Sequence, residues 1–346
     1  MNLSPLQNNH PAADPVFFRT TPEALFRLGT TLYQKGELDE ALEHLEKCVE
    51  LKPDLIAAYL TLSKLYQQQN RPNFAAASLM LYLEYAPNST AVLFDLGNLF
   101  AAYKDYDNAI DYFKRILEID PNNGSARHAV AALSGETTTT APRQHVQKIF
   151  DDLAENFESH LTDLGYNAPE ELKEMLISLH EEKPHFQRAI DLGCGTGLSG
   201  SQFRPLVSHF TGLDLSPKMV KIAHEKEVYD ELTTSDICPY IESSNQQYDL
   251  IIATDVFVYV GDLTHVFKTI STHSLPGACF LFTTEVASEE TGYVLRTSGR
   301  YAHSHHYIET LANEYGFTIE SSQYNNLRNE GLQPIKGELF VLRART

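Results

Sequence analysis

The sequence predicts two architectures in one chain: an α-helical solenoid, followed by a Rossmann-like, doubly wound α/β sheet of seven strands. A pattern with a period of 34 residues fills the first part, and strand-like runs alternate with helix-like runs in the second. At 346 residues the chain is long enough for two domains. The predicted divisions are a poorly ordered N-terminus at 1–20, the solenoid at 21–133, a linker at 134–143 and the sheet domain at 144–346.

Composition and charge exclude several classes of protein. A formal net charge of −19 argues against a nucleic-acid-binding surface, which needs Lys and Arg to neutralise phosphates. Residues 1–20 lack a basic start followed by an apolar run, and no apolar stretch is long enough to span a membrane, so we expect neither a signal peptide nor a membrane span. The four cysteines have neither paired nor metal-ligand spacing, which favours a reduced, cytoplasmic protein without a metal site.

The repeat pattern predicts helical hairpins. Small residues would let the two helices of a hairpin approach, large apolar residues would fill the space between them, and proline would stop the second helix. The residues that recur in phase are Leu28, Leu62 and Leu96; Gly29, Ser63 and Gly97; Ala41, Ala75 and Ala109; Leu45, Leu79 and Phe113; and Pro53, Pro87 and Pro121.

This pattern resembles tetratricopeptide repeats at 22–55, 56–89 and 90–123, with a capping helix at 124–133. The resemblance implies a groove that binds a protein or peptide partner. The alternative is that the repeats cover the second domain or mediate self-association.

A glycine loop organises the second part. Residues 188–198, RAIDLGCGTGL, predict a strand ending at Asp191, a tight turn and a helix start. Glycine at 193, 195 and 197 would allow positive φ and close approach of a ligand, and open N–H groups at the helix start would favour an anionic or polar group. A dinucleotide-binding fingerprint would need a third glycine where Leu198 stands, which weighs against an NAD enzyme.

Acidic residues mark the ends of the predicted strands. In an open α/β sheet, ligands bind outside the carboxyl ends of the strands, so these acids would gather beside the glycine loop. The predicted strands are 188–193, 209–214, 231–236, 248–254 and 278–285, with helices near 198–205, 217–226, 263–274 and 305–315 and a closing antiparallel pair; the acids are Asp191, Asp214, Asp236 and Asp255.

The loop and the acids together resemble class I S-adenosylmethionine-dependent methyltransferases. The resemblance implies S-adenosylmethionine as cofactor, with Asp191 near its methionine amino group, Asp214 on the ribose, Met219 on the adenine, and Asp236 with Ile237 at the adenine amino group. The remaining implied cofactor-binding residues are Gly193, Cys194, Gly195, Gly197, Leu215, Thr254 and Asp255. Phe150, Phe157 and His160 are candidates for a lid over the cofactor, unless the two phenylalanines simply belong to the core.

The sequence indicates less clearly which residues would bind the methyl acceptor. Residues 286–307 predict a long insertion in which His303 or His306 is a general base and Arg300 holds an anionic acceptor; the alternative is a solvated loop with a helix cap at Ser304. The order of motifs looks like the bacterial family of predicted methyltransferases with tetratricopeptide repeats. That implies a methyltransferase whose repeats recruit a partner or protein substrate. The alternatives are a small-molecule methyltransferase with repeats used for assembly, and a non-catalytic scaffold that binds S-adenosylmethionine.

Overall fold

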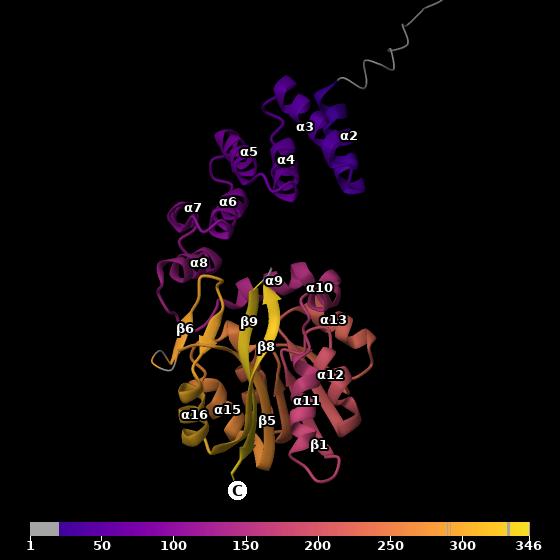
Figure 1. Ribbon diagram of the computed structural model, residues 1–346, viewed down its shortest axis with the longest axis vertical. Coiled ribbons are helices and arrows are strands. Elements are labelled where there is room, and N and C mark those ends of the chain that lie inside the picture. Colours follow the sequence, from indigo (N-terminus) through magenta and orange to yellow (C-terminus); the bar gives the residue numbers. More distant parts are fainter. Residues whose placement is uncertain (1–20, 289, 291, 331–332, 346) are drawn as a thin grey trace, which may run out of the picture. The chain divides into compact units, whose positions relative to one another are not determined.

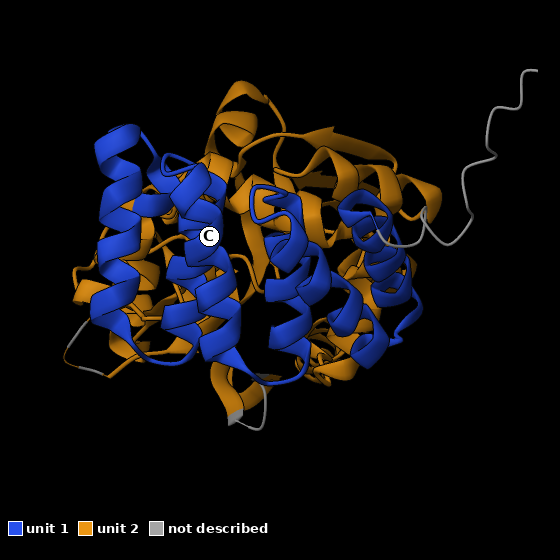
Figure 2. Ribbon diagram, turned by 90° about the horizontal axis from the view of Figure 1, so that it is seen from above, with its two compact units in different colours: residues 1–126 blue, residues 127–346 orange. Residues whose placement is uncertain are grey.

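A computed structural model describes residues 21–288, 290, 292–330 and 333–345. The predicted poorly ordered N-terminus, 1–20, lies outside the described residues. The chain divides into two compact units, one up to Ala126 and one from Arg127 (Figure 2). The division falls inside helix α8 (Gly124–Ser134), and the domain bounds drawn from the sequence stay predictions.

The first unit consists of helical hairpins (Figure 1). Helix α2 packs on α3, α4 on α5 and α6 on α7, as predicted for three tetratricopeptide-like repeats. The helices are α2 (Pro22–Lys35), α3 (Leu38–Leu51), α4 (Ala57–Gln68), α5 (Pro72–Tyr85), α6 (Thr90–Ala102) and α7 (Tyr106–Ile119).

The small and large residues of the repeat pattern meet inside each hairpin. A Cβ atom on Gly29 would lie 2.7 Å from Cγ of Leu45, and one on Gly97 would lie 2.6 Å from the ring of Phe113. Larger residues would therefore push the paired helices apart. Leu28 departs from the pattern: it is 41% exposed, whereas its counterparts in the two later repeats are buried.

The second unit is built on a mixed sheet with strand order β3-β2-β1-β4-β5-β7-β6, and β9 joins β5 and β8. Strands β3, β2, β1, β4 and β5 run parallel, which is the doubly wound arrangement that the sequence predicts. The strands are β1 (Phe186–Leu192), β2 (Val207–Asp214), β3 (Glu231–Thr234), β4 (Tyr248–Ala253), β5 (Ser274–Val286), β6 (Tyr293–Leu295), β7 (Tyr301–His303), β8 (Phe317–Glu330) and β9 (Gln333–Ala344).

Helices cover both faces of this sheet. Alternate strand residues point to opposite faces: Ile251 packs with α14, α15 and α16, while Leu250 and Ile252 pack with α11 and α12. The helices are α9 (Arg143–Leu153), α10 (Phe157–Asp163), α11 (Ala168–Ser178), α12 (Leu198–Phe203), α13 (Pro217–Glu225), α14 (Ile237–Ser243), α15 (Thr264–Thr272) and α16 (His305–Glu314).

Within the described residues the sheet has nine strands rather than the predicted seven. The predicted insertion at 286–307 contains the two additional strands, β6 and β7, which form a hairpin. Residues Cys279–Glu285 of β5 pair with β9, and Glu285 and Val286 pair with β7, so Glu285 has a partner in both strands. We use the name fork for the region around Glu285, where β5 pairs with β7 of one hairpin and β9 of the other.

Three features of the described part of the chain bear on the class of protein. No helix there is long and apolar enough to cross a membrane. No group of three or more His, Cys, Asp or Glu side chains there could hold a metal ion. The four cysteines are free thiols. The cytoplasmic location stays a prediction.

We expect Leu45→Ala to destabilise the repeats by about 2–5 kcal/mol, because Leu45 is fully buried against Gly29 and its loss leaves a cavity. Leu51→Ala is the matched control on the same helix, since Leu51 is 53% exposed, and should change stability by about 0.5 kcal/mol or less. Chemical denaturation followed by far-UV circular dichroism measures both. Equal effects of the two substitutions would contradict the packing described here.

Candidate active site

A cavity of about 380 Å³ lies in the second unit, where β1, β2 and β4 end. Its floor comes from the loops that follow these strands, including Gly193, Asp214 and Thr254. Its other walls come from α9, α10 and the residues just before α9. The volume lies in the range of small-molecule sites, about 300–1,000 Å³. The carboxyl ends of the strands therefore carry the site, as expected for this fold.

The glycine loop is held by bonds within the protein. Gly193 has a φ of +71°, and a Cβ there would lie 2.5 Å from Cγ2 of Val256. The amides of Gly193 and Cys194 both donate to the carbonyl of Leu213, at 2.8 Å. These two amides are already bonded and are therefore not available to a ligand, while the expectation for the open N–H groups at the start of α12 stays a prediction. Glycine at 193 is required by backbone conformation and by close packing against Val256.

Asp214 links the glycine loop to the end of β2. Its carboxylate accepts hydrogen bonds from the amide of Gly195 at 3.0 Å and from the amide of Ser216 at 2.8 Å. Burial raises the pKa of Asp214, and the two amide bonds act in the opposite direction. A carboxylate has about four acceptor positions, so Asp214, which lines the cavity, can still accept bonds from a ligand.

Asp191 is fully buried beneath the loop. Its Oδ2 accepts a 2.6 Å hydrogen bond from the hydroxyl of Tyr229, and its Oδ1 is buried without a hydrogen-bond partner. Burial raises the pKa of Asp191 to about 7, and the nearby charge of Asp214 acts in the same direction. Glycines make room for the tyrosine ring, since a Cβ on Gly200 would lie 2.4 Å from it.

The other residues implied as cofactor ligands fall into two groups. Those that line the cavity are Cys194, Gly195, Leu215, Asp236, Ile237, Thr254 and Asp255. Asp236 also caps α14, because its Oδ1 accepts a 2.8 Å bond from the amide of Ile237. Gly197, Met219 and Asp191 are not among the lining residues, and Met219 is fully buried in α13. Apolar contact with a ligand would therefore come from Leu215 and Ile237.

Asp255 is engaged by an arginine that the sequence analysis does not single out. Nη1 of Arg328, on β8, donates to both carboxylate oxygens of Asp255, at 2.7 and 2.8 Å. The backbone of Asp255 has a φ of +58°, and its amide donates to the hydroxyl of Thr283. The aspartate thus fixes β8 over the end of β4.

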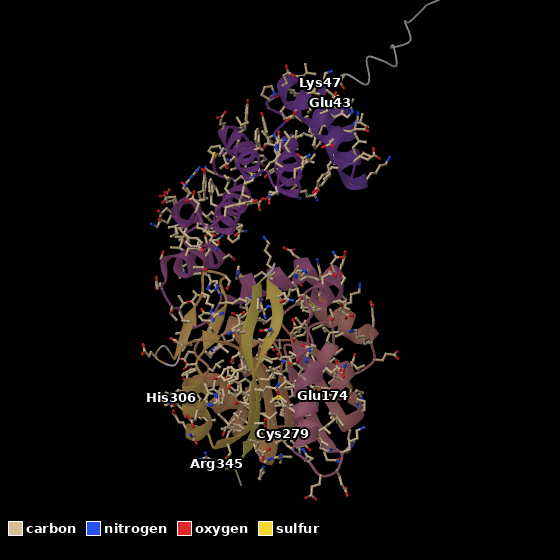
Figure 3. The ribbon with its side chains drawn as sticks, viewed as in Figure 1. Glu43, Lys47, Glu174, Cys279, His306 and Arg345 are labelled. Atoms are coloured by element: carbon tan, nitrogen blue, oxygen red, sulfur yellow. The ribbon has the colours of Figure 1, made fainter. Side chains whose placement is uncertain are left out.

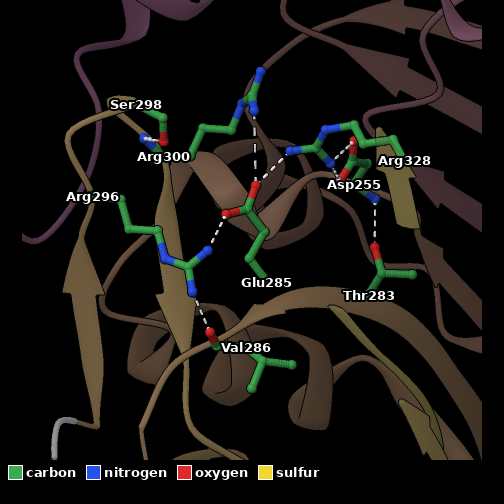
Figure 4. Close-up of polar contacts among 8 residues, drawn as sticks. All are labelled: Asp255, Thr283, Glu285, Val286, Arg296, Ser298, Arg300 and Arg328. Atoms are coloured by element: carbon green, nitrogen blue, oxygen red, sulfur yellow. Dashed lines mark hydrogen bonds and ion pairs between the residues drawn. The ribbon is translucent and has the colours of Figure 1, made fainter. Parts of the chain in front are cut away.

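Glu285 lies at the centre of three arginines at the fork (Figure 4). Its side chain is buried, and its carboxylate accepts from Nη2 of Arg328 at 2.5 Å and from Nη1 of Arg296 at 3.1 Å. Nη1 of Arg300 lies 3.9 Å away from the same carboxylate. Burial raises the pKa of Glu285, whereas the three arginines favour its charged form. Arg300 and Arg328 both line the cavity.

The two histidines that the sequence suggests as general bases lie elsewhere. His303 is buried, its Nε2 lies 3.0 Å from the carbonyls of both Val260 and Gly261, and burial lowers its pKa to about 4. The His306 side chain, on α16 (Figure 3), is 73% exposed and lies 3.7 Å from Glu309. Neither histidine is among the residues lining the cavity, whereas Arg300 is.

The stretch predicted as a linker is attached to the second unit by hydrogen bonds. We call residues 136–141 the strap. Thr138 bonds to the hydroxyl of Tyr301 at 2.5 Å, and the carbonyl of Thr139 accepts from the amides of Gly261 and Asp262. The amide of Ala141 donates to the carbonyl of Tyr259. The strap therefore holds the segment after β4 and the β6–β7 hairpin, and its own residues 140 and 141 line the cavity.

All three lid candidates line the cavity, and Phe150 also packs against a hydrophobic cluster that includes Val146 and Tyr301. Phe150 on α9 and Phe157 on α10 are half-buried, and His160 is exposed. The ring of Phe150 packs edge-on against those of Phe157 and Tyr259, with centroids 6.0 and 5.4 Å apart. Tyr259 in turn contacts Arg300. One continuous wall thus runs from the two helices to the fork.

No local sequence pattern predicts two of the contacts at this site. Arg328 stands 73 positions after Asp255 and Tyr229 stands 38 after Asp191, so only the folded chain brings each pair together. The nearest available signal for Tyr229 is the pair Gly200 and Gly212, which leave space for its ring.

Comparison with known proteins assigns both parts of the chain. Residues 157–322 match the family of methyltransferase domains, and residues 22–55 and 91–123 match tetratricopeptide repeats. The chain therefore carries tetratricopeptide repeats and a methyltransferase domain. This confirms the predicted class of enzyme, a methyltransferase, and agrees with S-adenosylmethionine as its cofactor.

Individual relatives match only parts of the chain. Malonyl-[acyl-carrier protein] O-methyltransferase of Bacillus cereus is 27% identical over 146 residues, 40% of this chain and 52% of the relative. Anaphase-promoting complex subunit CDC16 of Saccharomyces cerevisiae is 29% identical over 112 residues, 30% of this chain and 13% of the relative. The matches thus span about half of these relatives or less. The solved N-methyltransferase NodS of Bradyrhizobium japonicum WM9, in complex with S-adenosylhomocysteine, covers 51% of this chain and 86% of its own at 17% identity, with a TM-score of 0.42.

The residues around the cavity fit such a cofactor. The buried Oδ1 of Asp191 lacks a partner, and the Asp214 carboxylate faces the cavity with acceptor positions to spare. A Cβ on Gly195 would have only the Phe157 ring within 4 Å, at 3.6 Å, so that side of the loop is open to a ligand. Leu215 and Ile237 supply apolar contacts for an aromatic ring.

We expect Asp191→Asn to remove a pH dependence of stability. Because burial raises the folded-state pKa from 3.8 to about 7, folding is penalised as Asp191 ionises, and the free energy of unfolding should fall as pH rises through this window. Relative to Asp191→Asn, the wild type should lose on the order of a few kcal/mol between pH 4 and 7. Urea denaturation at several pH values measures this. The exposed Asp152→Asn is the control, and parallel curves for wild type and Asp191→Asn would contradict the prediction.

Proposed function

We propose that this protein transfers a methyl group from S-adenosylmethionine to an acceptor that its tetratricopeptide repeats bring to the methyltransferase domain. The proposal rests mainly on one observation, the cavity at the carboxyl ends of the strands. The glycine loop, the Asp214 carboxylate and the side chains of Arg300 and Arg328 all line it. The bound cofactor would supply a methyl group already activated on a sulfonium.

The chain's own residues would bind and orient. Asp214 would accept hydrogen bonds from the ribose hydroxyls, and Asp191 would lie near the methionine amino group, directly or through water. Leu215 and Ile237 would pack against the adenine. Helices α9 and α10 would exclude water with Phe150 and Phe157, so that transfer depends mainly on alignment of the acceptor with the methyl group.

Two alternative functions would use the same cavity. A small-molecule methyltransferase would use the repeats for assembly. The cavity volume of about 380 Å³ suits a small acceptor molecule. The relative from Bacillus cereus is named for an acceptor attached to a carrier protein, which combines a small acyl group with a protein partner. A non-catalytic scaffold would bind the cofactor and transfer nothing.

We expect Asp214→Ala to weaken S-adenosylhomocysteine binding roughly tenfold to a hundredfold, because hydrogen bonds to a charged group contribute about 1.5–3 kcal/mol. Isothermal titration calorimetry measures the affinity. Asp152→Ala, at an exposed position on α9 outside the cavity lining, is the matched control and should bind as the wild type does. Unchanged affinity in a folded Asp214→Ala variant would remove the ribose assignment.

The role of the repeats is tested with methyl-tritiated S-adenosylmethionine, the purified protein and a lysate from cells lacking this protein. Label in a discrete protein band, lost when the repeats carry Leu45→Ala, would support recruitment of a protein acceptor. Label confined to the small-molecule fraction would assign the repeats to assembly. Tight cofactor binding with no label in any fraction would favour the scaffold.

A further inference from the structure

The ring of Tyr229 occupies space that two glycines leave open. A Cβ atom on Gly200 would lie 2.4 Å from Cζ of Tyr229. One on Gly212 would lie 2.9 Å from Leu232 and 3.1 Å from the same tyrosine ring. Neither glycine has a positive φ, so the backbone conformation does not require glycine at either position. Glycine weakens a helix or a strand relative to alanine, and here it makes room for the tyrosine.

The backbone beside Tyr229 is anchored to β2. The amide of the next residue, Asp230, donates to the carbonyl of Phe210 at 2.8 Å, and its Oδ2 accepts from the amide of Phe210 at 2.6 Å. Arg204 pairs with the same carboxylate at 2.6 Å. The tyrosine ring packs edge-on against that of Phe210, with centroids 4.9 Å apart. The tyrosine hydroxyl is therefore carried by a ring that is fixed at both ends.

This hydroxyl binds one oxygen of Asp191 and leaves the other without a partner. It donates to Oδ2 at 2.6 Å, whereas Oδ1 is buried without a hydrogen bond. Burial and the charge of Asp191 raise the pKa of Tyr229, so the hydroxyl keeps its proton and stays a donor. Burial also raises the pKa of Asp191 to about 7, and the tyrosine bond acts in the opposite direction. Such a bond is stronger to a charged acceptor and so favours the ionised carboxylate.

The other ionisable groups that act on Asp191 do not favour its charged form. Asp214, at the end of β2, raises the pKa of Asp191. The thiol of Cys194 and the hydroxyl of Tyr166 also interact with Asp191, and burial raises the pKa of both, so both are neutral. Among the described residues that act on Asp191, the Tyr229 hydroxyl is thus the group that stabilises the carboxylate.

An ionised Asp191 suits the amino group of S-adenosylmethionine. That group is protonated at neutral pH, and its N–H donors need an acceptor. Oδ1 of a carboxylate is an acceptor, whereas a protonated carboxyl group has no charge and carries an O–H donor of its own. The loop that follows Asp191 lines the cavity from Gly193 to Thr196. The ionisation of Asp191 therefore decides whether this part of the site attracts an ammonium group.

We propose that Tyr229 is a positioning residue for the cofactor: its hydroxyl keeps Asp191 ionised and leaves Oδ1 for the cofactor's amino group, directly or through water. This inference rests on the proposed function and adds a regulation of its site by protons. Cofactor binding requires ionised Asp191, so the affinity rises as pH rises through the pKa of Asp191 and is fully present above it. Tyr229 sets the pH at which this happens.

The test measures the affinity of the full-length protein for S-adenosylhomocysteine by isothermal titration calorimetry from about pH 5.5 to about pH 8. We expect the affinity of the wild type to rise across this range. Tyr229→Phe keeps the ring and removes only the hydroxyl. It should move the rise to higher pH by about one unit and weaken binding about tenfold at neutral pH. Tyr248→Phe, at a buried position on β4 outside the cavity lining, is the matched control and should keep the wild-type profile.

A second probe separates contact with the amino group from packing of the glycine loop. Methylthioadenosine carries the adenine and the ribose of the cofactor without the amino group, so Tyr229→Phe should leave its affinity unchanged. Asp191→Asn cannot ionise, so its affinity for S-adenosylhomocysteine should be low and should not rise with pH. Adding Tyr229→Phe to Asp191→Asn should change that profile no further, because the two residues act as a pair.

The outcomes separate this inference from the proposed function. A Tyr229→Phe profile that coincides with that of the wild type would overturn the inference, and so would a wild-type affinity that does not change with pH. An equal loss of affinity for both probes would also overturn it, because the tyrosine would then act through packing alone. A wild-type protein that fails to bind S-adenosylhomocysteine at any pH would contradict the proposed function instead.

Discussion

The ion pair between Arg328 and Asp255 fixes one side of the cavity. Through it the C-terminal hairpin is attached to the end of β4, and the same guanidinium reaches Glu285 at the fork. Removing one partner of such a buried pair typically costs about 3–5 kcal/mol, because the remaining charge is left uncompensated. The left-handed backbone of Asp255 is uncommon for a residue other than glycine, and these contacts hold it. The same side chains thus contribute to stability and line the cavity.

The two halves of the cavity are built by different means. The side that follows β1 and β2 uses short-range contacts: a glycine loop bonded to the carbonyl of Leu213, and a carboxylate at Asp214 bonded to the amides of Gly195 and Ser216. The side at the fork uses long-range contacts between elements far apart in the chain. The first side can therefore stay constant while the second changes with its hairpins.

This difference explains what the sequence could predict. The repeats follow from the 34-residue period, and the sheet and its glycine loop follow from local patterns around residues 188–214. The sequence could not indicate β6 and β7, because three-residue strands leave no periodicity, nor could it indicate the pairing of Arg328 with Asp255. Residue type and the place of the insertion at the edge of the sheet suggest His303 as a base, and only tertiary packing against the carbonyls of Val260 and Gly261 determines that this ring is buried.

The strap gives the stretch between the repeats and the methyltransferase domain a second role. Its hydrogen bonds to Tyr259, Gly261 and Tyr301 make it a structural part of the cavity wall, although its composition resembles that of a spacer. A catalytic fragment cut at residue 144 would lack one edge of its own binding site. Exchange of the repeat array between related enzymes would thus have to preserve residues 136–143, and recombination at that point would alter the enzyme as well as its partner.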